Sequence, residues 1–166
     1  MEAARVEVGA PRCIAQQGDS GGKAEVALNI FFDSSALAKR YIEEKGSDQV
    51  QAILSSASTL AVSVICVPEI VSALCRRRRE RKISTAEYRS AKASVLSDID
   101  DATVIGLTEE VIAQAVALLE QFPLRSADAL HIACASEWST DLFVSADDRQ
   151  CKAARTRGLR VEAITV

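Results

Sequence analysis

The sequence contains no apolar run long enough to cross a membrane. The longest runs, such as residues 60–67, fall far short of the roughly 20 residues that a spanning helix needs. The start of the chain also lacks the compact apolar stretch of a signal peptide, because Ile14 is followed by alanine, two glutamines and a glycine. We therefore expect a protein that is neither exported nor embedded in a membrane, and we expect it in the cytoplasm.

Cysteine is present without any pattern that joins it into a site. The chain has an odd number of cysteines and no CxxC spacing, and most of them lie in apolar segments; they are Cys13, Cys66, Cys75, Cys134 and Cys151. This excludes a disulfide framework and a zinc site built on paired cysteines. We expect reduced cysteines that pack in the core, which agrees with a cytoplasmic location.

Histidine and excess positive charge are scarce as well. The single histidine, His131, has no second histidine or nearby cysteine at a spacing that suits zinc or a nucleophile–base pair, so we expect a structural residue. The net charge of −3 argues against a protein that coats nucleic acid by bulk attraction. The chain has one basic cluster, formed by residues 76–79 with Arg81 and Lys82. It is either a solvated helix end or a contact for RNA phosphates or an acidic partner.

Length and composition predict one domain with an appended segment. A chain of 166 residues with 48% hydrophobic residues can bury a sizeable core. The first 27 residues carry four glycines and a proline without any sustained apolar period. We expect a flexible N-terminal extension at residues 1–27 and a globular domain at residues 28–166.

Short apolar runs alternate with helical patterns along this domain. The runs expected as strands are residues 27–32, 60–64, 104–107, 142–144 and 161–164; the segments expected as helices are residues 48–56, 68–82, 84–98, 108–122, 127–138 and 148–157. Such alternation predicts an α/β fold, a three-layer α/β/α sandwich around a central, mainly parallel sheet.

Four acidic residues, Asp33, Glu69, Asp128 and Asp147, fall where a predicted strand ends or a helix begins. In a parallel sheet these positions share one rim, and carboxylates gathered together suit a hard divalent cation. Each acid alone could be a helix cap worth about 0.3–1 kcal/mol. Glu69 and Asp128 are embedded in apolar surroundings that capping does not explain, so they need a compensating partner.

Three further acids have plainer explanations. Asp148, next to Asp147, is expected to be a helix cap, although it is also the alternative fourth acid of the site. Asp100 and Asp101 precede a strand and are expected in a solvated turn at the opposite rim.

The residues around the four acids resemble a known family. The segments are IFFDSSAL at residues 30–37, PEI at 68–70, LRSADALHIA at 124–133 and FVSAD at 143–147. In this order they resemble the PIN-domain family, and closely the VapC-type toxins of bacterial and archaeal toxin–antitoxin pairs. The resemblance covers about residues 29–166.

The resemblance implies a magnesium- or manganese-dependent endoribonuclease that hydrolyses RNA phosphodiester bonds, with a small antitoxin as partner and a homodimeric state. Asp33, Glu69, Asp128 and Asp147 match the catalytic, metal-binding acids. We expect Asp33 and Asp128 to bind the cation directly, while Glu69 and Asp147 orient water or a second ion.

Several polar residues next to the acids are expected to contact the substrate. Ser34 and Ser145 could hydrogen-bond a ligand carboxylate or a phosphate, and basic side chains near the acids could grip the RNA backbone; these are Arg125 and Arg149, with Lys39 and Arg40.

Three alternatives stay open at this stage. A haloacid-dehalogenase-like phosphatase also places an aspartate at a strand end, but it needs a second acid where this chain has Ser35. A PIN nuclease that processes RNA without an antitoxin would use the same acids. A PIN-like binding or regulatory protein without catalysis would differ in failing to bind a cation.

Overall fold

The computed structural model describes residues 28–165, so the extension predicted at residues 1–27 and Cys13 lie outside the described part. Five strands form one sheet in the order β3-β2-β1-β4-β5. They are β1 (Asn29–Phe32), β2 (Thr59–Ser63), β3 (Thr103–Ile105), β4 (Leu142–Ser145) and β5 (Val161–Ala163). All four neighbouring pairs are parallel, which confirms the predicted sheet.

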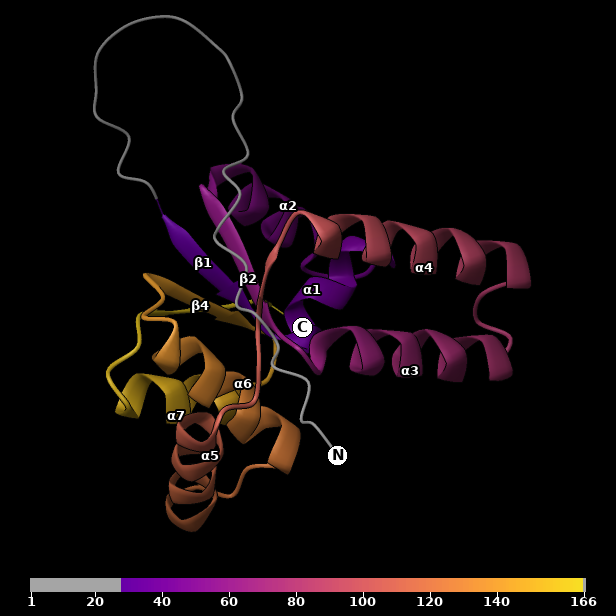
Figure 1. Ribbon diagram of the computed structural model, residues 1–166. Coiled ribbons are helices and arrows are strands. Elements are labelled where there is room, and N and C mark those ends of the chain that lie inside the picture. The colour runs from indigo at the N-terminus through magenta and orange to yellow at the C-terminus, as the bar shows by residue number, and fades with distance from the viewer. Residues whose placement is uncertain (1–27, 166) are drawn as a thin grey trace, which may run out of the picture.

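Helices cover both faces of this sheet (Figure 1). One face carries α1 (Ser34–Leu37), the 3-10 turn η1 (Ala38–Arg40), α2 (Ser47–Ser56), α3 (Cys66–Arg79) and α4 (Thr85–Asp100); the other carries α5 (Glu109–Gln121), α6 (Ser126–Glu137) and α7 (Asp148–Thr156). The chain winds outward from β1 to β3 along one face and then returns along the other. The predicted α/β/α sandwich is therefore confirmed.

Successive residues of the central strands pack into opposite cores. In β1, Ile30 and Phe32 join the core under α1–α4, while Phe31 joins the core under α5–α7. The same alternation divides Ala61 from Val62 in β2. This period of two explains why these strands read as unbroken apolar runs, since both faces are buried.

Helix boundaries differ from the sequence expectations in a few places. Helix α3 begins at Cys66 and not at Pro68, so the proline lies inside the first turn, where no backbone donor is needed. The predicted capping box is confirmed, because Ser84 Oγ accepts from the Glu87 amide at 3.1 Å. Asp100 is the last residue of α4 and not part of a turn, although it does precede β3 as expected.

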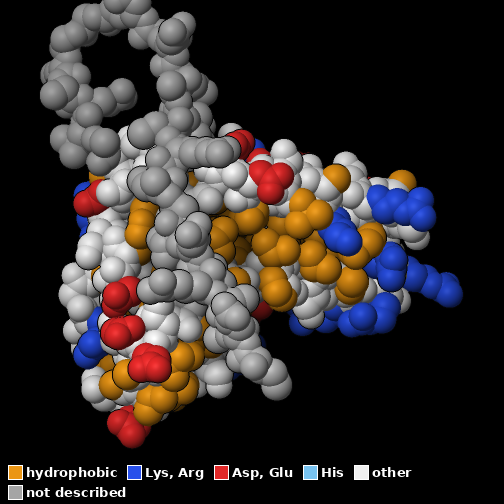
Figure 2. All heavy atoms as spheres, viewed as in Figure 1, with side chains coloured by type: hydrophobic (Ala, Val, Ile, Leu, Met, Phe, Trp, Pro, Cys, Tyr) orange, Lys and Arg blue, Asp and Glu red, His pale blue; other side chains and the backbone are white. Residues whose placement is uncertain are grey.

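The paired helices α3 and α4 extend beyond the sheet as an arm (Figure 1). The basic cluster of the sequence lies at the far end of this arm, visible as the blue end in Figure 2. Arg77 pairs with Glu44, and the Arg78 guanidinium lies 4.7 Å from the centre of the Tyr88 ring. The cluster is thus partly used in holding the arm, away from the acidic rim.

The four cysteines in the described part of the chain are free, and Cys66, Cys134 and Cys151 are buried, as expected. Among residues 28–165, no helix has the length and apolar character required to span a membrane.

Gly46 fixes the turn before α2 and gives a test of the packing against the C-terminal segment. Its φ is +94°, and an added Cβ would lie 2.6 Å from Ile164 Cγ2 and 2.7 Å from the Thr165 carbonyl oxygen. Gly46→Ala combines left-handed strain of about 1–2 kcal/mol with overpacking of about 1–3 kcal/mol. Gly158→Ala is the matched control, since Gly158 has φ +88° and open space around it. Urea unfolding should show the larger loss at Gly46; equal losses would contradict the packing.

Candidate active site at the carboxyl end of the sheet

Two of the predicted acids, Asp33 and Asp147, follow strands that are neighbours in the sheet, at the point where the strand order changes direction. β1 and β4 are neighbours, with Phe32 paired to Val144, and the Asp33 amide donates to the Val144 carbonyl at 3.0 Å. Asp33 follows β1, and Asp147 follows β4 after Ala146. In open parallel sheets the functional crevice lies outside the carboxyl ends of the strands where the strand order reverses, which here is this point.

Asp33 is a nearly buried carboxylate, with 3% of its surface exposed. It caps α1 by accepting from the Ala36 amide at 3.0 Å, and Ser35 Oγ lies 2.9 Å from both of its oxygens. Burial raises the pKa of Asp33 above its ordinary value in spite of these hydrogen bonds. Ser35 Oγ also accepts from the Ala146 amide at 3.0 Å, so one hydroxyl joins the ends of β1 and β4.

Glu69 is held differently from the other three acids. It lies in the first turn of α3, where its Oε2 accepts from Ser34 Oγ at 2.7 Å and lies 2.6 Å from His131 Nε2. Burial opposes its ionisation, but the hydrogen bonds from His131 and Ser34 hold the pKa of Glu69 below its ordinary value. Capping therefore does not explain Glu69, and its compensating partners are Ser34 and His131.

Asp128 does take part in a cap, contrary to the sequence expectation. Its Oδ2 accepts from the Arg125 amide at 3.2 Å, closing the first turn of α6. Burial, and to a smaller extent the charge of Asp147, raise the pKa of Asp128 above its ordinary value. Asp128 therefore caps a helix, and the negative charge of Asp147 still raises its pKa.

Asp147, and not Asp148, is the N-cap of α7. Its Oδ1 accepts from the Arg149 amide at 2.9 Å and the Gln150 amide at 3.0 Å. Burial is opposed by these bonds and by the Arg149 side chain, which together hold the pKa of Asp147 below its ordinary value. Asp148 is exposed in the first turn of the helix, so the expectation that Asp148 is the cap was wrong.

Gln150 connects three parts of the rim and was not anticipated from the sequence. It is fully buried, accepts from Ser145 Oγ at 2.5 Å and donates from Nε2 to the Asp128 carbonyl at 3.2 Å. A glutamine in a short polar helix gives no sequence signal of burial. The contact of His131 with Glu69 was also missed, although His131 lies on α6 only three residues after Asp128, which was the available signal.

The residues expected to contact substrate fall into two groups. Arg125 and Arg149 are exposed beside the acids, and Arg149 Nη2 lies 3.4 Å from Asp147 Oδ2. Ser34 is bound to Glu69, while Ser145 has no exposed surface and accepts from the Asp147 amide at 3.1 Å. Ser145 therefore positions Asp147, and a direct contact with substrate is not supported.

Lys39 and Arg40 were expected to contact the substrate, but neither side chain reaches the rim. Lys39 is buried and pairs with Glu44 at 3.0 Å, and its Nζ also donates to the Lys45 carbonyl at 2.9 Å. Arg40 pairs with Asp98 of α4 at 2.6 Å. Both side chains stabilise the layer of α1–α4.

The donor set fits a cation that keeps much of its water. Carboxylate oxygens are hard ligands, and burial raises the pKa of Asp33 and of Asp128, so a bound cation would favour the ionised form of both. Within residues 28–165, no three His, Cys, Asp or Glu side chains already converge as a metal cage. Fewer than three direct side-chain ligands would leave the remaining coordination positions of a cation to water.

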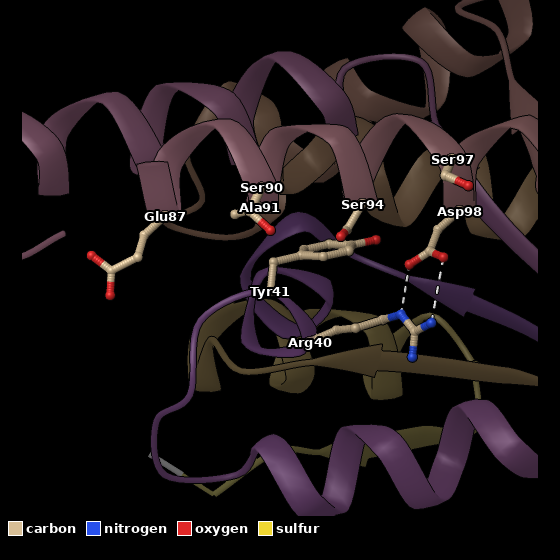
Figure 3. Close-up of a pocket in the computed structure, with 8 residues that line it drawn as sticks. All are labelled: Arg40, Tyr41, Glu87, Ser90, Ala91, Ser94, Ser97 and Asp98. Carbon is tan, nitrogen blue, oxygen red and sulfur yellow. Dashed lines mark hydrogen bonds and ion pairs between the residues drawn. The ribbon is translucent and has the colours of Figure 1, made fainter. Parts of the chain in front are cut away.

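One surface cavity lies away from these acids. It has a volume of about 470 Å³ and lies between η1 and α4, with Tyr41 and Arg40 facing Ser90, Ser94 and Asp98 (Figure 3). The Arg40–Asp98 pair forms part of its wall. None of the four acids lines it, so it is separate from the candidate active site.

The opposite pKa shifts of Asp33 and Asp147 predict opposite effects of neutralising them. Burial raises the pKa of Asp33, so the folded protein holds the proton of this carboxyl group more tightly than the unfolded chain does. The free energy of unfolding is therefore highest at low pH, and it falls as the pH rises through the folded pKa and the buried carboxyl group ionises. Asp33→Asn should therefore raise the free energy of unfolding near pH 7, with a gain that shrinks toward about pH 4. Asp147→Asn should lower stability near pH 7, with a loss that disappears on acidification, because the folded pKa of Asp147 is depressed. Urea unfolding at both pH values, in chelator, checks this; shifts of the same sign would contradict it.

Known proteins share both the sequence and the fold. The family model described as PIN domain matches residues 30–156. The chain is 30% identical over 136 residues to Ribonuclease VapC46 of Mycobacterium tuberculosis, covering 81% of this chain and 96% of that protein. It is also 30% identical over 135 residues to Ribonuclease VapC49 of the same organism, covering 80% and 93%.

Two solved structures show the same fold at lower identity. FitAcB from Neisseria gonorrhoeae superposes with a TM-score of 0.63 at 16% identity, covering 80% of this chain and 95% of that one. VapC20 of Mycobacterium tuberculosis, described as a sarcin-ricin loop cleaving toxin, gives 0.59 at 19% identity, covering 75% and 94%. The matched segment contains all four acids, and the chain belongs to the PIN-domain family and to its VapC-type ribonucleases.

Proposed function

We propose that this chain is a divalent-metal-dependent endoribonuclease that hydrolyses RNA phosphodiester bonds as the toxin of a type II toxin–antitoxin pair. The observation that carries the proposal is the buried carboxylate of Asp33 at the reversal point of the sheet, with three further acids tied to the same rim. Holding these charges together is unfavourable unless a cation compensates them. The relation to VapC ribonucleases supports RNA as the substrate.

The residues would divide the work by how they are held. Asp33 and Asp128 carry the carboxylates whose charge burial disfavours, so they would hold Mg²⁺ or Mn²⁺ directly. The pKa values of Glu69 and Asp147 lie below their ordinary values, so both acids are ionised readily and would orient water on the cation or hold a second ion. The bound metal would supply Lewis-acid polarisation of the phosphate and of an attacking water. Arg125 and Arg149 are placed to bind phosphate oxygens beside the acids.

The alternative enzyme class is poorly supported by the same geometry. A phosphatase that uses Asp33 as a nucleophile would need an acid at the position of Ser35 to handle the leaving-group proton. Ser35 instead hydrogen-bonds both oxygens of Asp33. The presence of all four acids also weighs against a PIN-like protein that only binds or regulates.

The toxin role implies a small antitoxin as partner. Proteins of the same fold include one from Klebsiella pneumoniae described as a toxin–antitoxin complex and VapBC-5 from Mycobacterium tuberculosis, described as a member of the VapBC family of toxin–antitoxin systems. We infer that an antitoxin tail would enter the acidic rim and block the carboxylates. A PIN nuclease that works in RNA processing alone would have the same rim without this partner. Free, unbridged thiols suit the reducing cytoplasm in which such a pair would act.

We also propose that the chain forms a homodimer through the β3 edge. Six of the seven exposed large hydrophobic side chains within residues 28–165 lie on the loop after β2, on β3 and its following loop, and on α5; they are Val64, Val104, Leu107, Ile112, Val116 and Leu119. We call them the β3-edge patch. β3 ends the sheet, so its outer backbone edge has no strand beside it among the described residues.

Charge around the β3-edge patch favours a second copy as the occupant. The exposed acids Glu109, Glu110 and Glu120 lie on α5, while the arm ends in exposed arginines (Figure 2). A two-fold pairing would bring the same patch on each copy together, and the opposite charges of the arm and of α5 would attract each other between the copies.

The enzymatic proposal is tested by RNA cleavage with purified protein. With Mg²⁺ or Mn²⁺ the parent should cut RNA, and chelator should abolish cutting. Asp33→Asn should lower the rate by at least about a hundredfold, the scale of losing a group that stabilises transition-state charge. Asp100→Asn is the matched control, because Asp100 lies at the other end of the sheet. Cleavage by Asp33→Asn at the parental rate would overturn the site.

Co-expression with a small protein encoded upstream would decide between a toxin and an RNA-processing enzyme, because only a toxin would lose its cleavage activity in the presence of that protein.

The dimer proposal is tested by the mass of the protein in solution. Val116→Glu places a charge on a member of the β3-edge patch that is 49% exposed, and should yield a monomer by sedimentation. Leu96→Glu changes a side chain that is 45% exposed on α4, outside the patch, and should leave the dimer intact. A parent that is already monomeric, or a dimer in both variants, would contradict the assigned surface.

A further inference from the structure

His131 is the one strongly polar side chain between residues 129 and 135 of α6, a stretch that is buried except for the partly buried Leu130. Only 1% of its surface is exposed, and its ring packs edge-on against Phe31, with centroids 6.4 Å apart. Within the described chain its Nδ1 is buried with no hydrogen-bond partner. A buried nitrogen left without a partner costs stability, so an apolar residue would suit this position better if packing were its only role.

Within residues 28–165, the one polar contact of the ring is with Glu69. His131 Nε2 lies 2.6 Å from Glu69 Oε2, and because an ionised carboxylate has no proton to donate, Nε2 carries the hydrogen. Ser34 Oγ donates to the same oxygen at 2.7 Å. The other oxygen, Oε1, accepts no hydrogen bond from residues 28–165 and remains available for a ligand. Two donors on one oxygen thus fix the rotation of the carboxylate.

This contact also joins the two helical layers. Glu69 belongs to α3, on the face that packs against Ile30 and Phe32, whereas His131 belongs to α6 on the face of Phe31. His131 therefore reaches across the carboxyl end of β1 to a carboxylate at the candidate active site.

We propose that His131 is a positioning residue that, with Ser34, holds Oε2 of Glu69 so that Oε1 is presented to the divalent cation and the water of the cleavage site. The inference rests on the proposed nuclease function. It assigns the histidine no contact with RNA and no proton transfer. Partners that orient a metal-site carboxylate typically contribute about 10- to 100-fold in metal affinity or activity.

Two conservative substitutions separate positioning from packing. The amide nitrogen of glutamine is separated from Cβ by the same number of covalent bonds as Nε2 of histidine. The amide nitrogen of asparagine is one bond nearer to Cβ, as Nδ1 of histidine is. His131→Gln should keep the parental Mn²⁺ affinity and kcat within about threefold, and His131→Asn should weaken both by about 10- to 100-fold. KM for RNA should change little in either variant, because the ring does not touch the substrate.

A double-mutant cycle with Glu69→Gln identifies the route of the effect. In the Glu69→Gln background, His131→Asn should cause no further loss of Mn²⁺ affinity, measured by calorimetry on the folded protein. Ile132→Val, in the fully buried next position of α6, is the packing control; it should lower thermal stability and leave Mn²⁺ binding unchanged.

The outcomes separate this inference from the proposed function. A parent that neither binds Mn²⁺ nor cleaves RNA overturns both. A parent that does both, with His131→Asn matching it, overturns the positioning role alone. Equal losses in His131→Gln and His131→Asn that add to those of Glu69→Gln would show that the histidine only packs, and would also overturn it.

Discussion

Strand β1 is enclosed on every side: β2 and β4 flank its edges, and helices cover both of its faces. Parallel strands buried on two faces must send their connections over the sheet, and the winding reverses direction at β1. The backbone beyond Phe32 therefore leaves the core at the point where the helical layers separate. A polar group placed there is held by the whole sheet, which is why the position of Asp33 constrains the rest of the rim.

The acids at this rim combine a structural role with a chemical one. Asp33 caps α1, Asp128 closes the first turn of α6 and Asp147 caps α7, so each is oriented by backbone amides that do not move independently of the fold. Ser35, Ser145 and Gln150 connect these caps through short hydrogen bonds. Capping explains how the carboxylates are aimed, but the raised pKa values of Asp33 and Asp128 show that it does not fully offset their burial. A cation at the rim would supply the missing compensation.

Glu69 is the one acid of the four whose side chain does not cap a helix. Its carboxylate contacts His131, which belongs to the helical layer on the opposite face of the sheet. The bond to His131 ties α3 to α6 across the end of β1. Any change in the spacing of the two layers would change the orientation of this carboxylate. The active-site geometry is thus coupled to the packing of the cores on both sides of the sheet.

The sequence alone was sufficient for the sheet and the order of helices, because strand burial and helix capping leave local patterns such as the apolar run before Asp33 and the Ser84–Glu87 box. It also identified one rim, since every predicted acid follows a strand or opens a helix. It was wrong about Asp148 and about the capping role of Asp128, and it placed Lys39 and Arg40 near the substrate. The caps of Asp128 and Asp147 are local contacts with backbone amides two or three residues away, which the sequence left undecided between neighbouring acids. Only tertiary structure decided the ion pairs of Lys39 and Arg40, the burial of Gln150 and the pairing of His131 with Glu69, because partners 62 residues apart leave no periodic signal when each lies in an ordinary helix.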